Sequence, residues 1–208
     1  MIAPDGQTWA IIPTKSFDNA KSRLSSALSR QLRAKLAQDL FNHVLSCLRE
    51  SVAVDQVLVV TTPDAHTVRE NAAGPDTHIL LDPEAVSSLN QVVDAGIAHL
   101  STLTRPRRIL IIMADLPSLN VQDIETLLEP TNSDTIAIAP DRHNLGTNAL
   151  AFNTNALTKT RFGRADSFEQ HKALFLLTQR PFAVIETTGL GFDLDVPDDL
   201  TALRRLNS

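Results

Sequence analysis

Two short runs of apolar, mostly β-branched residues constrain the fold of this chain most strongly. They read "VLVV" at residues 57–60 and "ILII" at residues 109–112. A strand that is apolar at every position must be covered on both faces, and this is typical of parallel sheets with helices on either side. We therefore expect both runs to be central strands of such a sheet.

Helix-like segments separate the strand-like ones. Residues 30–50 place leucine and valine at helical spacing, and Ser29 can cap the start of this helix. Asn120 and Asp123 form a variant of the capping box. The alternation predicts a single α/β domain over residues 1–208, with three α/β/α layers and a mostly parallel central sheet. Further strands are expected at 9–13, 77–82, 134–141, 148–153 and 182–187, and further helices at 67–74, 89–100, 167–179 and 196–206.

The composition excludes several classes of protein. Lys and Arg number 19 against 24 Asp and Glu, a formal net charge of -5, which argues against a general nucleic-acid binder. An anionic ligand would need a local cluster of cations. Cys47 is the single cysteine, so no intramolecular disulfide can form. We see no secretory signal and no apolar run of membrane-spanning length, so we expect a cytoplasmic protein without a membrane partner.

Ligands of such sheets gather beyond the carboxyl ends of the strands. The first strand runs into "AIIPTKSFDNAKSRLS" at residues 10–25, which carries Lys15, Lys21 and Arg23 but no glycine. A P-loop wraps phosphates with backbone N–H groups and needs glycine, so this stretch is not a P-loop. Its three cations can neutralise a polyphosphate. They would equally suit another anion, or form a solvated surface in which Lys21 pairs with Asp18.

Three aspartates follow other strand-like segments. Asp115 ends the strand that contains "ILII", while Asp193 and Asp195 lie in "GFDLDVP". If that segment is extended, the i,i+2 spacing places both carboxylates on one side. Three converging carboxylates need a divalent cation, and hard oxygen ligands select Mg²⁺ or Mn²⁺. A turn or cap role explains Asp115 as well, and a solvated strand edge explains the other two.

Two further constellations offer small polar groups. "DRHNLGTNAL" contains Thr147 and Asn148, although a hairpin loop between strands explains its Gly and Asn as well. "RFGRADSFEQH" places Gly163 and Ser167 before a helix whose N-terminus can hold a phosphate, although Ser167 can equally be an N-cap. The six histidines show no metal-ligand spacing. We place His143 alone near the site and the others in the core or on the surface.

These segments resemble, in order along the chain, the 2-phospho-L-lactate guanylyltransferases. The resemblance covers Trp9 to Leu203 and rests on "IIPTKSFDNAKSRLS", "MADLPSL", "APDRHNLGTNAL", "RFGRADSFEQH" and "GFDLDVPDDL". That family belongs to the MobA-like nucleotidyltransferases, has a GT-A-type α/β fold and serves biosynthesis of the deazaflavin coenzyme F-420. Many members carry a glycine where Ser88 stands in this chain.

The resemblance implies a reaction and a set of site residues. A small phosphorylated carboxylic acid (2-phospho-L-lactate, phosphoenolpyruvate or 3-phospho-D-glycerate) attacks the α-phosphorus of GTP, and pyrophosphate leaves. The residues so implied fall into four groups: catalytic Lys15, Lys21, Arg23 and Asp115; nucleotide-binding Pro13, Lys15, Lys21, Arg23, Thr61, Ser87, Ser88, Asn90, Asp115 and Pro117; acceptor-binding Thr147, Asn148, Gly163 and Ser167; and Asp115, Asp193 and Asp195 as ligands of Mg²⁺ or Mn²⁺.

Two other functions stay open at this point. Another MobA-like enzyme, acting on molybdopterin or a sugar phosphate, would usually carry a "GG" segment after the first strand, and this chain has none. A non-catalytic nucleotide-binding protein would have no need to keep all three acids. The helix at residues 31–50 could supply a homodimer surface, but core packing explains its leucines as well.

Overall fold

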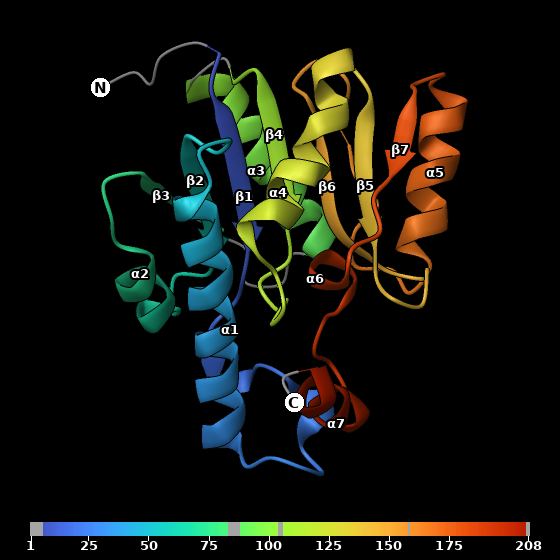
Figure 1. The fold of residues 1–208 in the computed structure, drawn as a ribbon. Helices are drawn as coiled ribbons and strands as arrows, with labels where there is room; N and C mark the ends of the chain where they lie inside the picture. The colour runs from blue at the N-terminus through green and yellow to red at the C-terminus, as the bar shows by residue number, and fades with distance from the viewer. Residues whose placement is uncertain (1–5, 83–87, 104–105, 158, 207–208) are drawn as a thin grey trace.

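A single seven-stranded sheet organises the chain (Figure 1). The computed structural model describes residues 6–82, 88–103, 106–157 and 159–206. The strand order is β3-β2-β1-β4-β6-β5-β7, and β6 runs antiparallel to both of its neighbours while the other pairs are parallel. This confirms the mostly parallel sheet. The strands are β1 (Thr8–Pro13), β2 (Gln56–Thr61), β3 (Thr77–Leu81), β4 (Arg108–Ile112), β5 (Ile136–Pro140), β6 (Thr147–Asn153) and β7 (Phe182–Val184).

Helices follow most of the strands, as the apolar spacing predicts. The short elements α6, η1, η2 and η3 were not predicted, because one turn of helix is too short to show a period. Within the described ranges, no helix combines the length and apolar character needed to span a membrane. The helices are α1 (Arg30–Glu50), α2 (His66–Ala72), α3 (Leu89–Leu103), α4 (Val121–Leu128), α5 (Ser167–Leu177), α6 (Thr188–Gly191) and α7 (Pro197–Leu206), with 3-10 turns η1 (Phe17–Asn19), η2 (Ser22–Leu24) and η3 (Glu129–Ser133).

Two hydrophobic clusters cover the two faces of the sheet. Ile12 and Leu110 belong to the cluster that α1, α2, α4 and α6 complete, whereas Ile11 and Ile111 belong to the cluster that α3 and α5 complete. Alternate side chains of one strand thus enter different cores. The three-layer arrangement is confirmed, and packing against the sheet accounts for the apolar spacing of α1.

A third, smaller cluster lies beyond the carboxyl ends of the parallel strands. It consists of Leu24, Leu40 and Leu194, which come from η2, from α1 and from the segment before α7. Figure 1 shows α7 beside the loop that follows β1, below the sheet in that view. This cluster therefore holds the loop with the three cations against the segment that carries Asp193 and Asp195.

Local hydrogen bonds fix the helix starts. The Ser29 hydroxyl accepts a bond from a backbone N–H in the first turn of α1, and Asn120 and Asp123 form the predicted reciprocal capping box at 3.1 and 3.0 Å. Ser167 behaves differently. It is the first residue of α5, and Asp166 occupies the N-cap position, so the interpretation of Ser167 as an N-cap is wrong.

The loop between β5 and β6 is the antiparallel hairpin that was one interpretation of "DRHNLGTNAL". The Asp141 carboxylate accepts hydrogen bonds from the backbone N–H groups of His143, Leu145 and Gly146 at 2.9, 3.0 and 2.8 Å. A Cβ at Gly146 would lie 2.8 Å from Asp141 Oδ2. The glycine thus serves the hairpin itself.

Replacing Asn120 with Ala removes one half of the capping box. We expect the free energy of unfolding to fall by about 1 kcal/mol, because a backbone N–H of α4 loses its partner. Urea denaturation measures this change. The matched control is Asn155→Ala, at an exposed position, which should change stability by less than about 0.5 kcal/mol. Equal losses in the two variants would contradict a capping role.

Candidate active site

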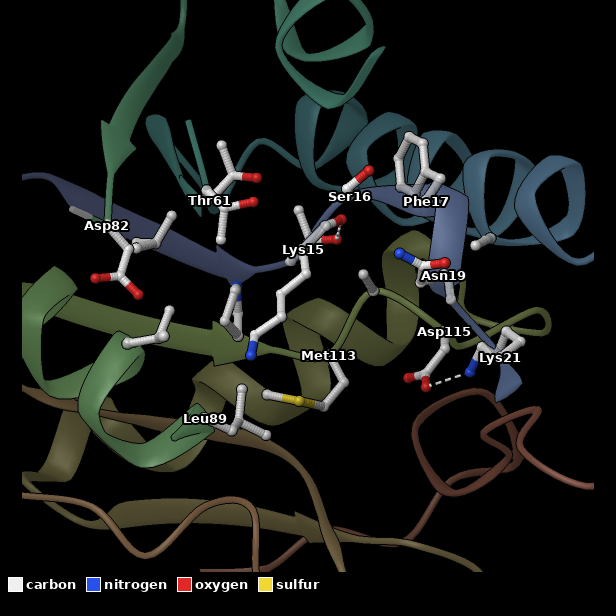
Figure 2. A pocket seen from close by; sticks show the side chains of 18 residues that line it. Lys15, Ser16, Phe17, Asn19, Lys21, Thr61, Asp82, Leu89, Met113 and Asp115 are labelled. Carbon is white, nitrogen blue, oxygen red and sulfur yellow. Dashed lines mark hydrogen bonds and ion pairs between the residues drawn. The ribbon is translucent and has the colours of Figure 1, made fainter. Parts of the chain in front are cut away.

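A cavity of about 430 Å³ opens at the carboxyl ends of β1, β2 and β4. Figure 2 shows Thr61 and Asp82 at one end, Asp115 and Lys21 at the other, and Lys15 between them. The cavity thus has an Asp82 end, which carries a carboxylate, and a charged end, where Lys21 pairs with Asp115. The lining residues are Pro13, Thr14, Lys15, Ser16, Phe17, Asn19, Ala20, Lys21, Ala37, Val60, Thr61, Thr62, Asp82, Leu89, Val92, Met113, Ala114 and Asp115.

Five of the residues expected to bind the nucleotide line this cavity: Pro13, Lys15, Lys21, Thr61 and Asp115. They come from three strand ends, as the rule for open α/β sheets predicts. The remaining lining residues were not singled out from the sequence. Asp82 is the most informative of these, and its signal was its place directly after the strand "THILL".

Of the other expected nucleotide-binding residues, those that the structure describes do not line this cavity. Arg23 lines a separate hollow of about 260 Å³ beside Lys21. Pro117 is outside the lining of the cavity, and Ser87 falls outside the described residues. Ser88 hydrogen-bonds to Gln91 at the start of α3. Its role in nucleotide binding stays a prediction.

Asn90 is occupied within the fold. Its amide donates to Asp94 at 3.1 Å and accepts from the Thr160 hydroxyl at 2.8 Å. These bonds tie α3 to the segment before α5. A role in nucleotide binding for Asn90 also stays a prediction, since the residue does not line the cavity in this conformation.

Lys21 is the electrostatic centre of the charged end. Its Nζ lies 2.6 Å from Asp115 Oδ2 and 2.9 Å from Asp195 Oδ1, and its side chain is only 9% exposed. Burial alone would lower the pKa of Lys21, but the two carboxylates more than offset it and hold the pKa above its ordinary value. Lys21 is therefore an ammonium that pairs with these acids rather than with Asp18.

A backbone hydrogen bond brings the acidic segment to the end of β4. The Leu194 N–H donates to the Asp115 carbonyl at 3.2 Å, and the Leu194 side chain is fully buried in the third cluster. Successive side chains of an extended segment point in opposite directions, so Asp193 and Asp195 project away from that cluster. The alternation expected from "FDLDV" holds, although the segment is not part of the sheet.

Asp193 is the acid with the most altered ionisation. Burial, followed by the charge of Asp115, raises the pKa of Asp193 to about 6, while a hydrogen bond from the Asn148 amide opposes the shift. Like charges held together in a half-buried site disfavour ionisation, and a nearby cation would reverse this effect. The carboxylates of Asp115 and Asp193 are hard oxygen donors of the kind that Mg²⁺ prefers.

The three acids do not form a ready three-ligand site in this conformation. Asp195 is engaged by Lys21 and by Arg23, whose Nη1 lies 3.3 Å away. Among the described residues, no group of three or more acidic, His or Cys side chains is arranged to hold a metal ion. The carboxylates of the three acids have the donor chemistry that suits a divalent cation, but Lys21 contacts both Asp115 and Asp195 in this conformation, so the three could share one ion only if Lys21 moved.

A second ion pair, between Arg142 and Asp199, lies next to the segment that carries Asp193 and Asp195. Asp199 is buried and accepts hydrogen bonds from the backbone N–H groups of Asp195 and Val196 at 2.6 and 2.8 Å. Although burial raises the pKa of Asp199, these bonds and the paired Arg142 hold it below its ordinary value. Arg142 also lies over the Phe192 ring, 4.6 Å from its centre. No local sequence pattern marks the Arg142–Asp199 pair, because 57 positions separate the two residues.

Thr147 and Ser167, two of the expected acceptor-side residues, meet in a buried cluster. The Ser167 hydroxyl donates to Thr147 Oγ1 at 3.3 Å, and His171 Nδ1 lies 3.1 Å from the same oxygen. His171 Nε2 accepts from the Arg161 N–H at 2.9 Å, so the neutral ring donates through Nδ1. Burial lowers the pKa of His171 to about 4. This His was expected to be an ordinary core or surface residue, whereas His143 is exposed.

Gly163 and Asn148 are also held by the fold. Gly163 has φ +80, and a Cβ there would lie 3.0 Å from Cβ of Leu89, so the position favours glycine. The Asn148 amide donates to the Leu190 carbonyl at 2.9 Å. Within the described chain, none of the four expected acceptor-side residues lines the cavity, and their role stays a prediction.

The fold is one that solved nucleotidyltransferases share. Solved structures with the same fold include a nucleotidyl transferase from Methanothermobacter, at TM-score 0.68 and 12% identity over 96% of this chain and 97% of that one. A cytidylyltransferase from Leptospira borgpetersenii superposes at TM-score 0.65 and 12% identity, covering 96% of this chain and 85% of its own. At such low identity these likenesses establish the fold.

Sequence comparison identifies the family. Residues 8–203 match the family model described as "Guanylyl transferase CofC like", and the chain belongs to this family. It is therefore an enzyme of the nucleotidyltransferase class. A phosphoenolpyruvate guanylyltransferase of Conexibacter woesei is 39% identical over 202 residues, which cover 96% of this chain and 88% of the relative. A 2-phospho-L-lactate guanylyltransferase of Methanosarcina mazei is 30% identical, covering 93% and 85%.

The low pKa of His171 predicts acid sensitivity. Because the folded state holds the pKa near 4 instead of 6.5, the contribution of neutral His171 to stability is complete above pH 6.5 and is lost as the pH falls toward 4. The loss is at most about 3 kcal/mol. In thermal melts between pH 7.5 and 4.5, the Tm of His171→Gln should fall less steeply with decreasing pH than the Tm of the wild type.

The control is His99→Gln, which should keep the wild-type dependence of Tm on pH, since none of the described hydrogen bonds among Thr147, Ser167 and His171 involves His99. Parallel curves for wild type and His171→Gln would show that another group governs acid sensitivity.

Proposed function

We propose that the protein joins GMP from GTP to a small phosphorylated carboxylic acid, with release of pyrophosphate. The supporting observation is the order of groups along the cavity, in which the buried Asp82 stands at one end, Lys15 in the middle, and Lys21 with Asp115 at the other. A base, a triphosphate and a reacting phosphate need these groups in that order. Phosphoenolpyruvate and 2-phospho-L-lactate are the preferred acids, since the named relatives use them.

The Asp82 end of the cavity suits a guanine base. Asp82 is 9% exposed and follows β3, where its N–H donates to the Thr61 carbonyl at 2.7 Å. A carboxylate can accept from both N1–H and the 2-amino group of guanine, whereas adenine offers an acceptor at N1 and no 2-amino group. Thr61 Oγ1 is buried without a hydrogen-bond partner among the described residues and can donate to a base carbonyl. Leu89 and Val92 supply apolar contact for the ring.

The cations suit the triphosphate. Lys15 and Lys21 line the cavity, and Arg23 lies just beyond it. Positive groups that are already in place stabilise the charge that develops on the leaving pyrophosphate. The phosphate of the acid is itself a nucleophile, so the protein needs to align the two substrates and forms no covalent intermediate.

The cofactor is proposed to be Mg²⁺, with Mn²⁺ as a substitute. When bound, such an ion neutralises phosphate oxygens and polarises the phosphorus under attack. Asp115 and Asp193 would hold it, because both are carboxylates and because burial, followed by the charge of Asp115, raises the pKa of Asp193, an effect that a bound cation would reverse. Asp195 would join them once its cationic partners engage the triphosphate.

The acceptor acid is proposed to bind on the β6 side, near Thr147, Asn148, Gly163 and Ser167. Asn148 supports this placement, since its side chain is near enough to Asp193 to lower the pKa of that acid, against the larger effects of burial and Asp115. The three candidate acids differ by a methyl, a methylene or a hydroxymethyl group. Service to coenzyme F-420 biosynthesis and a cytoplasmic location are part of the same proposal, supported by the resemblance to the family.

The direct test is to incubate the protein with Mg²⁺, GTP or ATP, and each of the three acids. Mass spectrometry should detect a guanosine diphosphate-linked acid with at least one of them, together with pyrophosphate. Asp115→Asn should reduce the rate by at least about 100-fold while the protein stays folded. No product from folded wild-type protein with any of the three acids would overturn the proposal, and product with a sugar phosphate would replace it.

Replacing Asp82 with Asn should change the choice of base. The Asn amide can accept from N1–H but donates where guanine also donates, so kcat/KM for GTP should fall about 10- to 100-fold. Xanthosine triphosphate carries an oxygen at position 2 and should become the better substrate. Steady-state kinetics with both nucleotides measure the ratio.

The control for this switch is Asp76→Asn, at an exposed position away from the cavity, which should retain the preference for GTP. A gain of activity with xanthosine triphosphate cannot arise from misfolding. An unchanged nucleotide ratio in Asp82→Asn would remove Asp82 from base recognition.

A further inference from the structure

We propose that Lys21 acts as an internal counter-ion, which occupies the divalent-cation position in the free enzyme and leaves it when a triphosphate binds. Metal binding and nucleotide binding would then assist one another. This inference rests on the proposed use of a divalent cation and a nucleoside triphosphate. It concerns a role for Lys21 beyond contact with the phosphates.

The geometry of the ammonium group carries the proposal. Lys21 Nζ contacts one oxygen of Asp115 at 2.6 Å and one of Asp195 at 2.9 Å, so it bridges two acids that are 80 positions apart in the sequence. The side chain is 9% exposed, and this places the charge inside the site rather than on its rim. A cation between two carboxylates meets the same electrostatic need that a metal ion would meet.

Charge balance favours an exchange over joint occupancy. In the free protein three carboxylates face two cations, Lys21 and Arg23, and Asp193 has no cation bonded to it among the described ion pairs. If a divalent ion replaces Lys21, the charges of the ion and Arg23 balance those of the three acids. If Lys21 stays, the site carries an excess positive charge, which weakens metal binding.

The ammonium of Lys21 can move into an adjacent hollow. It lines both the 430 Å³ cavity and the smaller hollow that contains Asp195, so it stands at the boundary between the two. Its backbone adopts the left-handed region at φ +52, between the short turns η1 and η2, and its side chain forms the two ion pairs. A lysine carries its charge on a flexible four-carbon stem, which can redirect the ammonium toward phosphates without moving the sheet.

The alternative is a permanent structural ion pair. In that case the lysine holds Asp115 and Asp195 in position, and its removal would disorganise the two acids and weaken metal binding. Competition predicts the opposite sign from the usual loss of function, because deletion of a competing cation strengthens binding of the metal. Because the competing cation is a side chain of the protein itself, its effect on metal binding can be measured without any nucleotide.

The experiment titrates Mn²⁺ into the nucleotide-free protein and follows free Mn²⁺ by electron paramagnetic resonance. Lys21→Met and Lys21→Gln should bind Mn²⁺ about tenfold or more tightly than the wild type. Lys21→Arg keeps the charge and should bind as weakly as the wild type. Lys35→Met is the matched control, since Lys35 is exposed and pairs with Asp39 on α1, and it should leave the affinity unchanged.

Folding is checked by thermal melts of the same samples. If Lys21→Met or Lys21→Gln is destabilised, Mn²⁺ should raise its Tm by more than it raises that of the wild type. Equal or weaker Mn²⁺ binding and an equal Tm shift in both variants would overturn the proposal. The outcome is separate from the proposed reaction, because a wild type that is inactive with GTP can still show the Mn²⁺ pattern, and an active one can lack it.

Discussion

The ammonium of Lys21 between the carboxylates of Asp115 and Asp195 is the interaction on which the candidate site depends. It joins three segments that are far apart in the chain, namely the loop after β1, the end of β4 and the stretch before α7. The Leu24–Leu40–Leu194 cluster and the hydrogen bond from Leu194 to Asp115 hold the same segments from the apolar side. The ion pairs and the apolar cluster thus fix the position of the loop after β1 relative to the sheet.

A largely buried lysine with two acids contributes little to stability. Removing ions from water costs several kcal/mol each, and their mutual attraction often only balances that cost. Burial and the charge of Asp115 raise the pKa of Asp193 to about 6, and Asp193 has no cation among the described ion pairs. Groups with such shifts gather where a protein acts on charged ligands. The raised pKa of Asp193 is therefore consistent with the proposed cation site.

The sequence predicted those features that arise locally. The strands around "VLVV" and "ILII", the long helix α1 and the capping box at Asn120 all depend on neighbouring residues, and all are confirmed. The turns η1 and η2 and helix α6 are too short to show a period. The family resemblance assigned Asp115, Asp193 and Asp195 to one metal site. The structure places the three acids near one another, and their role as metal ligands stays a prediction.

Contacts between distant positions escaped prediction. His171 meets Thr147 across 24 positions, and Arg142 meets Asp199 across 57, so no local pattern marks either pair. Asp82 looked like the end of an ordinary strand until the sheet placed it in the wall of the cavity. Conversely, the family resemblance implied that Ser88 and Asn90 bind the nucleotide, whereas their side chains form hydrogen bonds within the start of α3.

The reversed direction of β6 has a consequence for how such a site can diversify. Because β6 is antiparallel, its first residues, Thr147 and Asn148, reach the edge where the parallel strands end. The cavity proposed to hold the nucleotide lies at the ends of β1 to β4, while the separate region proposed for the acid begins at the hairpin loop of residues 141–146, which Asp141 stabilises. If the acid binds there as proposed, changes in that loop would reshape its site and leave the four strands beneath the nucleotide untouched. One inverted strand would thereby separate the choice of acid from the choice of nucleotide.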